Sequence, residues 1–128
     1  MCRPLACLLL VVLAANAADS SGFRMEVDKD LGPEVDELAT VLPATIACIV
    51  EKQPERCGIK DFGVAHLSES QLRARFSGDV VVVSASGRAG AKDEIRAEFP
   101  RAGSEVGVIY FRRVRGAYQP VAVLLAIP

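Results

Sequence analysis

The sequence predicts an α+β fold in which one kinked helix, about residues 33–53, packs on an antiparallel sheet of four to six strands. First, apolar residues recur every three or four positions from Val35 to Ile49, as on one face of a helix. Second, the later segments alternate apolar and polar residues, as half-buried strands do. Third, two cysteines lie at the end of this helix. Strands with one apolar face need a cover, and the helix is the best candidate.

Residues 1–17 form a predicted signal peptide. Arg3 precedes an unbroken apolar run from residue 5 to residue 13, and Ala15-Asn16-Ala17 fits the small-x-small cleavage pattern. The run is too short to span a bilayer, so we expect no transmembrane segment in the mature chain. An uncleaved N-terminal anchor is the alternative. Cleavage near Ala17 makes the protein periplasmic or extracellular.

The mature chain has the length of one domain. We expect a flexible lead-in over residues 18–22 and a single α+β domain over residues 23–128. Cys2 and Cys7 leave with the signal peptide, so Cys48 and Cys57 remain as a predicted disulfide in an oxidising compartment. A redox role is disfavoured because catalytic pairs are usually separated by two residues.

The first elements follow from local patterns. Residues 23–28 alternate and predict a short strand at the edge of the sheet, with a frayed terminal arm as the alternative. Pro33 suits the first position of a helix, and acidic residues follow in the first turn. Pro43 removes one backbone hydrogen bond, so the helix is expected to kink there. Two short helices meeting at Pro43 are the alternative.

The middle of the chain is ambiguous. Residues 61–67 alternate like a strand. Over residues 68–76, Ser68 and Gln71 have the spacing of a helix capping box, whereas the alternation from Leu72 to Phe76 favours a strand. We favour the strand, because Ser77-Gly78-Asp79 would turn it into a hairpin with the next segment.

The remaining segments predict the body of the sheet. Val80–Ser84 is apolar at nearly every position, which indicates the central strand. Residues 94–99 alternate with Ile95, Ala97 and Phe99 facing inward. Residues 106–114 and 118–127 form the last hairpin, and Pro120 belongs at an edge or near a strand start.

Charge is divided unevenly along the chain. Residues 19–55 carry nine acidic and three basic side chains, and residues 56–128 carry eleven basic and seven acidic ones. This division indicates either internal complementarity or a dipolar surface whose basic end meets an anionic partner.

The sequence contains no catalytic or cofactor motif that we recognise. His66 is the single histidine, and no nucleophile elbow accompanies it. Asp93 and Glu94 would point to opposite faces of a strand, so they do not form a glycosidase pair. Residues 87–90 superficially match a glycine loop that clamps nucleic acid, but export makes nucleic acid an improbable partner. We therefore predict no enzyme activity, no cofactor and no metal.

The candidate binding site is the tip of the last hairpin, where arginines crowd beside aromatic residues. Arginine forks onto carboxylates and phosphates, and tyrosine and arginine often anchor protein interfaces. A solvated hairpin end is the alternative. The predicted binding residues are Tyr110, Arg112, Arg113, Arg115 and Tyr118.

The leading hypothesis is a small exported, non-catalytic binding protein that acts through protein–protein recognition. An inhibitor, an immunity-type protein or an envelope accessory protein would fit, and the partner would be another protein or an anionic envelope component. One alternative is a small-ligand carrier with a pocket between helix and sheet, lined by residues such as Leu42, Ile46 and Phe99. Another is an atypical hydrolase using His66. The sequence leaves the oligomeric state open.

Overall fold

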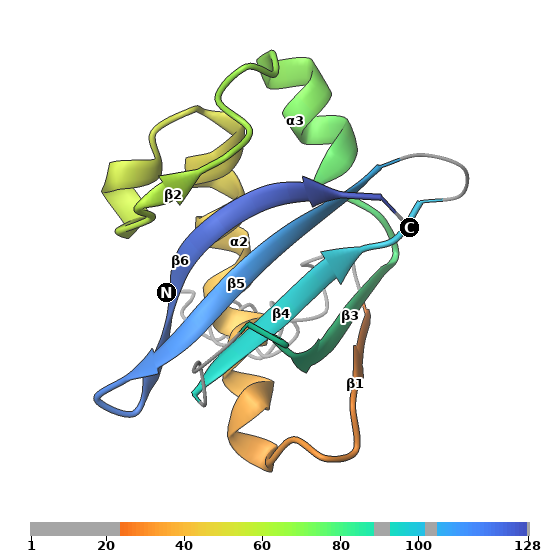
Figure 1. Cartoon of the computed structure of the whole chain (residues 1–128), viewed down its shortest axis with the longest axis vertical. Helices are drawn as coiled ribbons and strands as arrows, with labels where there is room; N and C mark the ends of the chain where they lie inside the picture. Colours follow the sequence, from red (N-terminus) through yellow and green to blue (C-terminus); the bar gives the residue numbers. More distant parts are fainter. Residues whose placement is uncertain (1–23, 89–92, 102–104, 128) are drawn as a thin grey trace, which may run out of the picture.

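The computed structural model describes residues 24–88, 93–101 and 105–127, and its centre is a six-stranded sheet (Figure 1). The order across the sheet is β1-β3-β4-β5-β6-β2. The predicted signal peptide (1–17), the lead-in (18–22) and Phe23 lie outside the described residues. The strands are β1 (Arg24–Val27), β2 (Asp61–Phe62), β3 (Val80–Ala85), β4 (Glu94–Phe99), β5 (Val106–Val114) and β6 (Ala117–Ala126).

The sheet is mixed, which corrects the expectation of a purely antiparallel one. Strands β3 to β6 are antiparallel to their neighbours, but β1 runs parallel to β3 and β2 runs parallel to β6. Parallel neighbours need long crossover connections, and here the intervening chain contains the helices. Alternation along a strand reports which face is buried and carries no information on direction, so the sequence pattern could not reveal this.

The predicted long helix begins as a 3₁₀ segment, η2 (Pro33–Glu37), and continues as α2 (Leu38–Val50). It ends three residues before the predicted boundary, and Lys52 just beyond adopts a left-handed φ of 58°. Pro43 lies inside α2 on its exposed side. The change of helix type falls at Leu38, so Pro43 does not divide the element into two.

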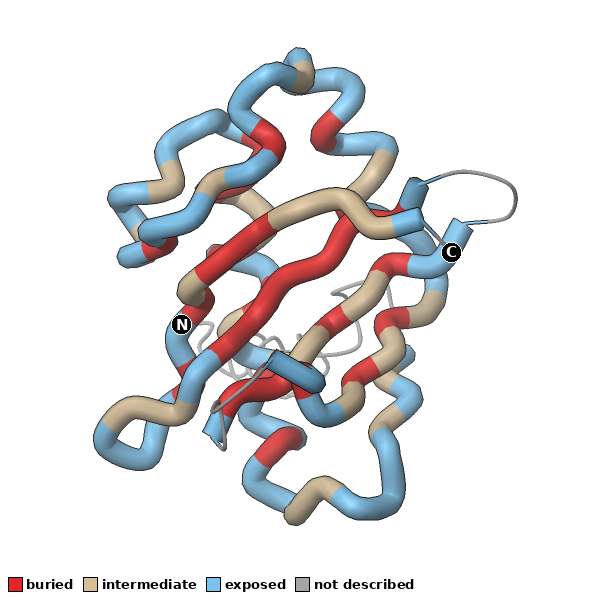
Figure 2. Tube along the Cα trace, viewed as in Figure 1, coloured by how far each residue is buried: buried red, intermediate tan, exposed pale blue. Residues whose placement is uncertain are grey.

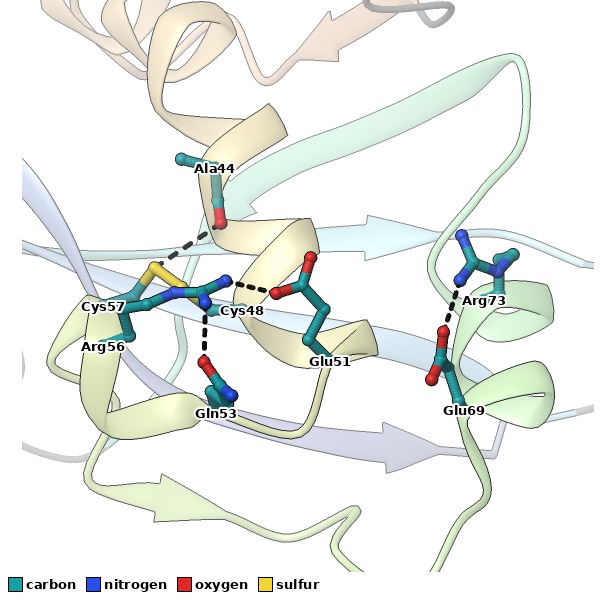
Figure 3. A network of polar contacts seen from close by, with 8 residues as sticks. All are labelled: Ala44, Cys48, Glu51, Gln53, Arg56, Cys57, Glu69 and Arg73. Atoms are coloured by element: carbon teal, nitrogen blue, oxygen red, sulfur yellow. Dashed lines mark hydrogen bonds and ion pairs between the residues drawn. A yellow bond between two sulfur atoms is a disulfide. The ribbon is translucent and has the colours of Figure 1, made fainter.

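The predicted disulfide between Cys48 and Cys57 is confirmed, and it joins the end of α2 to the 3₁₀ turn η3 (Pro54–Cys57). An ion pair also joins η3 to the end of α2, because Arg56 Nη2 lies 2.6 Å from Glu51 Oε1 (Figure 3). Gly58 then takes a positive φ of 80°, which glycine tolerates without steric cost. The chain thereby turns back toward β2 at the sheet edge.

Residues 68–76 form a helix, α3 (Glu69–Arg75), so the strand and the hairpin predicted there are wrong. The capping box is complete, because Ser68 Oγ accepts a hydrogen bond from the Gln71 N–H at 3.2 Å and Gln71 Oε1 accepts one from the Ser68 N–H at 2.8 Å. Leu72 and Phe76 are four residues apart and both buried. The helical period therefore accounts for the burial better than alternation does.

The core lies between the helices and one face of the sheet. Leu38, Leu42 and Ile49 of α2 join Leu72 of α3 and the inward residues of β4, which are Ile95, Ala97 and Phe99 as predicted. Figure 2 shows the longest buried stretch along β5.

Gly107 of β5 permits the end of α3 to approach this face of the sheet closely. A Cβ atom there would lie 2.7 Å from the backbone oxygen of Arg75 and 2.7 Å from Phe76 Cε1.

Two details of the sheet bear on the predictions. The valine strand β3 lies second from the edge rather than at the centre, and Val80 and Val82 are only half-buried. β1 lies at the edge, as predicted. Pro120 lies near the start of β6, beside the register shift opposite Tyr110 and Phe111, which agrees with the prediction for its position.

Candidate functional site

The five predicted binding residues do not form one patch. Tyr110 and Arg112 alternate with Phe111 along β5, and Phe111 belongs to the core. They therefore project from the outer face of the sheet, which we define as the face away from α2 and α3. Arg113 and Tyr118 are register partners on the other face, with Arg113 Cζ 5.4 Å from the Tyr118 ring centroid. Arg115 is exposed in the hairpin turn, with a φ of 54°.

A stripe of apolar side chains runs along β5 and β6 on the outer face. Its buried members are Val106, Val108, Tyr110 and Ala122, with Val121, Leu124 and Ala126 packed against them. Next to the stripe, β4 carries Arg96 and Glu98, which form an ion pair. The outer face therefore has mostly buried apolar side chains on β5 and β6, flanked by charged side chains on β4.

A buried carboxylate lies at one end of the stripe. The Glu94 side chain has no exposed surface, and its oxygens face two arginines from different segments. Arg112, the register partner of Glu94, places Nη2 3.2 Å from Oε2, and Arg88 places Nε 3.2 Å from Oε1. We call these three residues the Arg88–Glu94–Arg112 cluster. A buried charge is tolerated only when it is paired, so Glu94 holds the two guanidinium groups in place.

The two arginines remain available to a partner. Their side chains keep 41% (Arg88) and 51% (Arg112) of their surface exposed. Arg88 Cζ also lies 5.0 Å from the ring centroid of Tyr110, within the range of a cation–π contact. Among the described residues, Glu94 Oε1 accepts no hydrogen bond despite its ion pair with Arg88.

Two hollows adjoin the cluster and share Asp61 and Arg88. The first, the apolar hollow, has a volume of about 360 Å³ and is lined by Asp61, Gly63, Arg88, Tyr110, Ala122, Val123 and Leu124. The second, the charged hollow, has a volume of about 260 Å³ and is lined by Gly58, Lys60, Asp61, Arg88, Arg112, Val114, Gln119 and Val121. An apolar recess and a cationic recess thus lie side by side.

A third hollow, of about 210 Å³, lies at the end of the sheet where Arg113 and Tyr118 are found. It is also lined by the acidic residues Asp30, Glu34 and Asp93. Over residues 24–88, 93–101 and 105–127, no three His, Cys, Asp or Glu side chains come together as metal ligands would. This hollow therefore offers no candidate metal centre.

The residues considered for catalysis lie apart. His66 is exposed in the turn between β2 and α3, and in the described part of the chain its side chain makes no hydrogen bond or ion pair. Glu94 is buried while Asp93 is exposed. Of the loop at 87–90, residues 87 and 88 have no regular secondary structure, and residues 89 and 90 lie outside the described residues.

Sequence reasoning missed Arg88, Lys60, Asp61 and the role of Glu94. Alternation in β4 places Glu94 on the same face as Arg96 and Glu98, and this was the one available signal. Its contact with Arg112 depends on the register between β4 and β5, and that with Arg88 depends on the path of a loop. Neither is encoded by spacing along the chain.

Comparison with protein-family models, with curated proteins and with solved structures found no significant match for this chain. In the part of the chain that the structure describes, no helix has the length and apolar character needed to cross a bilayer.

Proposed function

We propose that this protein is a small exported, non-catalytic binding protein that recognises another protein through the outer face of its sheet. The observation that carries the proposal is the Arg88–Glu94–Arg112 cluster beside Tyr110, with two hollows adjoining it. Tyrosine and arginine dominate the energetic centres of protein interfaces. Because Glu94 and Tyr110 already orient the arginines, less side-chain entropy is lost when a partner binds.

Export is supported by two independent features. The signal-peptide pattern of residues 1–17 predicts it, and the Cys48–Cys57 disulfide is the kind of bond that persists in an oxidising compartment. An inhibitor, an immunity-type protein or an envelope accessory protein would fit this proposal, with a protein or an anionic envelope component as the partner.

The alternative functions receive less support. Leu42 and Phe99, expected to line a carrier pocket, are buried in the core, and Ile46 packs against it. None of the three residues lines any of the three hollows described above. The small-ligand carrier therefore stays a prediction without support from these hollows. The hydrolase alternative needs a side chain that exchanges a proton with His66. His66 is exposed, and no side chain in the described part of the chain is hydrogen-bonded to it.

Arg112 lies on the outer face and Arg115 in the hairpin turn, so substituting each in turn gives a matched experiment. We expect Arg112→Ala to abolish recovery of a partner when the tagged protein is purified from the native exported fraction, because it removes a guanidinium from the outer face. Arg115→Ala removes the same group from the exposed turn and should leave recovery unchanged. The partner identified in this way is then purified, and its affinity for both variants is measured by calorimetry.

Thermal unfolding shows whether each variant is folded. Equal recovery of the same partner by folded wild type and folded Arg112→Ala would remove the outer face from the proposal. Loss of recovery by Arg115→Ala with retention by Arg112→Ala would place recognition at the hairpin turn instead.

A further inference from the structure

We infer that the outer-face site binds the carboxyl-terminal end of a partner polypeptide whose last side chain is apolar. This inference rests on the proposed function and names the part of the partner that is recognised. It follows from the charge of the charged hollow, from the apolar hollow beside it and from the position of β2 at the sheet edge.

The charged hollow and the buried carboxylate together carry an excess of one positive charge. Lys60, Arg88 and Arg112 contribute three positive charges, and Asp61 and Glu94 contribute two negative ones. One carboxylate from a ligand would neutralise this excess. Arg112 and Arg88 are both partly exposed, and guanidinium groups bind carboxylates through paired hydrogen bonds.

The apolar hollow indicates which ligand group lies next to that carboxylate. In the last residue of a polypeptide, the side chain and the terminal carboxylate leave the same Cα atom. A site for such a residue needs an apolar recess directly beside a cationic one. The two hollows meet this requirement because Asp61 and Arg88 line both of them. The larger hollow, about 360 Å³, presents Tyr110, Ala122 and Leu124 to an apolar side chain.

The sheet edge favours a polypeptide over another amphiphilic carboxylate such as a fatty acid. Asp61 belongs to β2, the last strand in the sheet order, which has no strand beyond it among the described residues. An edge strand presents backbone N–H and C=O groups that an extended peptide can pair with. A fatty acid has no groups to satisfy them.

The test uses octapeptides displayed with free carboxyl ends and selected on the exported protein. We expect apolar residues to be enriched at the last position. The best peptide is then synthesised with a free carboxylate and with a terminal amide, and both are titrated by fluorescence polarisation. Loss of the charge-assisted hydrogen bonds should weaken binding of the amide by about tenfold or more.

The variants locate the site on this protein. Lys60→Gln removes one charge from the charged hollow and touches no ion pair of the described residues, so it should fold normally. We expect this substitution to lower the affinity for the free-acid peptide by about threefold to tenfold. Lys29→Gln is the matched control, because Lys29 is exposed beyond β1 at the opposite edge of the sheet, and it should leave the affinity unchanged.

Several outcomes overturn the inference. These are equal affinity for acid and amide, absence of apolar enrichment at the last position, an unchanged affinity of Lys60→Gln, and decanoate binding as tightly as the peptide. The proposed function fails separately, when Arg112→Ala recovers its protein partner as well as wild type does. A partner lost from Arg112→Ala but bound through an internal segment would overturn only the inference.

Discussion

At the scale of single residues, Glu94 holds two arginine side chains of the outer face in place. Its side chain is wholly buried at the first position of β4, while Arg88 and Arg112 are each partly exposed. The pairing is therefore asymmetric: both arginines already contact water, whereas among the described residues the charge of Glu94 is balanced only by the two guanidinium groups. Removing one partner of a buried charge costs more than the pair contributes.

This asymmetry gives a stability prediction. The double variant Arg88→Ala/Arg112→Ala leaves a buried, unpaired carboxylate and should lower the free energy of unfolding by about 3–5 kcal/mol. Glu94→Gln removes the charge but leaves two solvated arginines, and should cost about 1 kcal/mol. Urea denaturation at neutral pH measures both changes.

A third variant serves as the control. Combining Glu94→Gln with the two arginine substitutions removes the unpaired charge, so it should recover part of the stability that the double variant loses. A Glu94→Gln variant less stable than the double variant would contradict this account of the cluster.

At the scale of elements, local chemistry decides the helices. The complete capping box at Ser68 and Gln71 makes α3 a helix although its residues also alternate. The Cys48–Cys57 bond closes a short loop at the end of α2, with the cysteines nine positions apart. In the chain-entropy account, a short closed loop restricts the unfolded chain only modestly.

The disulfide should therefore contribute to stability without being essential to the fold. The double variant Cys48→Ala/Cys57→Ala is expected to lose about 2.5 kcal/mol of unfolding free energy and to keep its far-ultraviolet circular dichroism. Wild type kept reduced with dithiothreitol provides the matched comparison and should lose a similar amount. A variant that is unfolded in the absence of denaturant would show that the bond contributes far more than loop closure.

At the scale of the whole molecule, the edge strands connect distant parts of the chain. Arg24 pairs with Val80, 56 positions later (80 − 24), and Asp61 pairs with Ala122, 61 positions later (122 − 61). Such contacts close long loops before they add any stability.

The protein should consequently fold slowly for its size. We expect refolding of the oxidised chain in milliseconds to seconds, as for domains dominated by distant strand pairs. Stopped-flow dilution from urea, followed by tyrosine fluorescence, measures the rate. Refolding that is complete within the dead time of mixing would indicate that the edge strands form after the main barrier.

The α+β class, the disulfide, the main helix and the inward face of β4 could be predicted from the sequence, because each depends on neighbours along the chain. Ile95, Ala97 and Phe99 face the core as their alternation predicts. The tertiary structure alone decided the parallel edge strands and the burial of Glu94 between Arg88 and Arg112. Those features depend on strand direction, register and loop path, which bring together residues far apart in the sequence and leave no periodic trace within it.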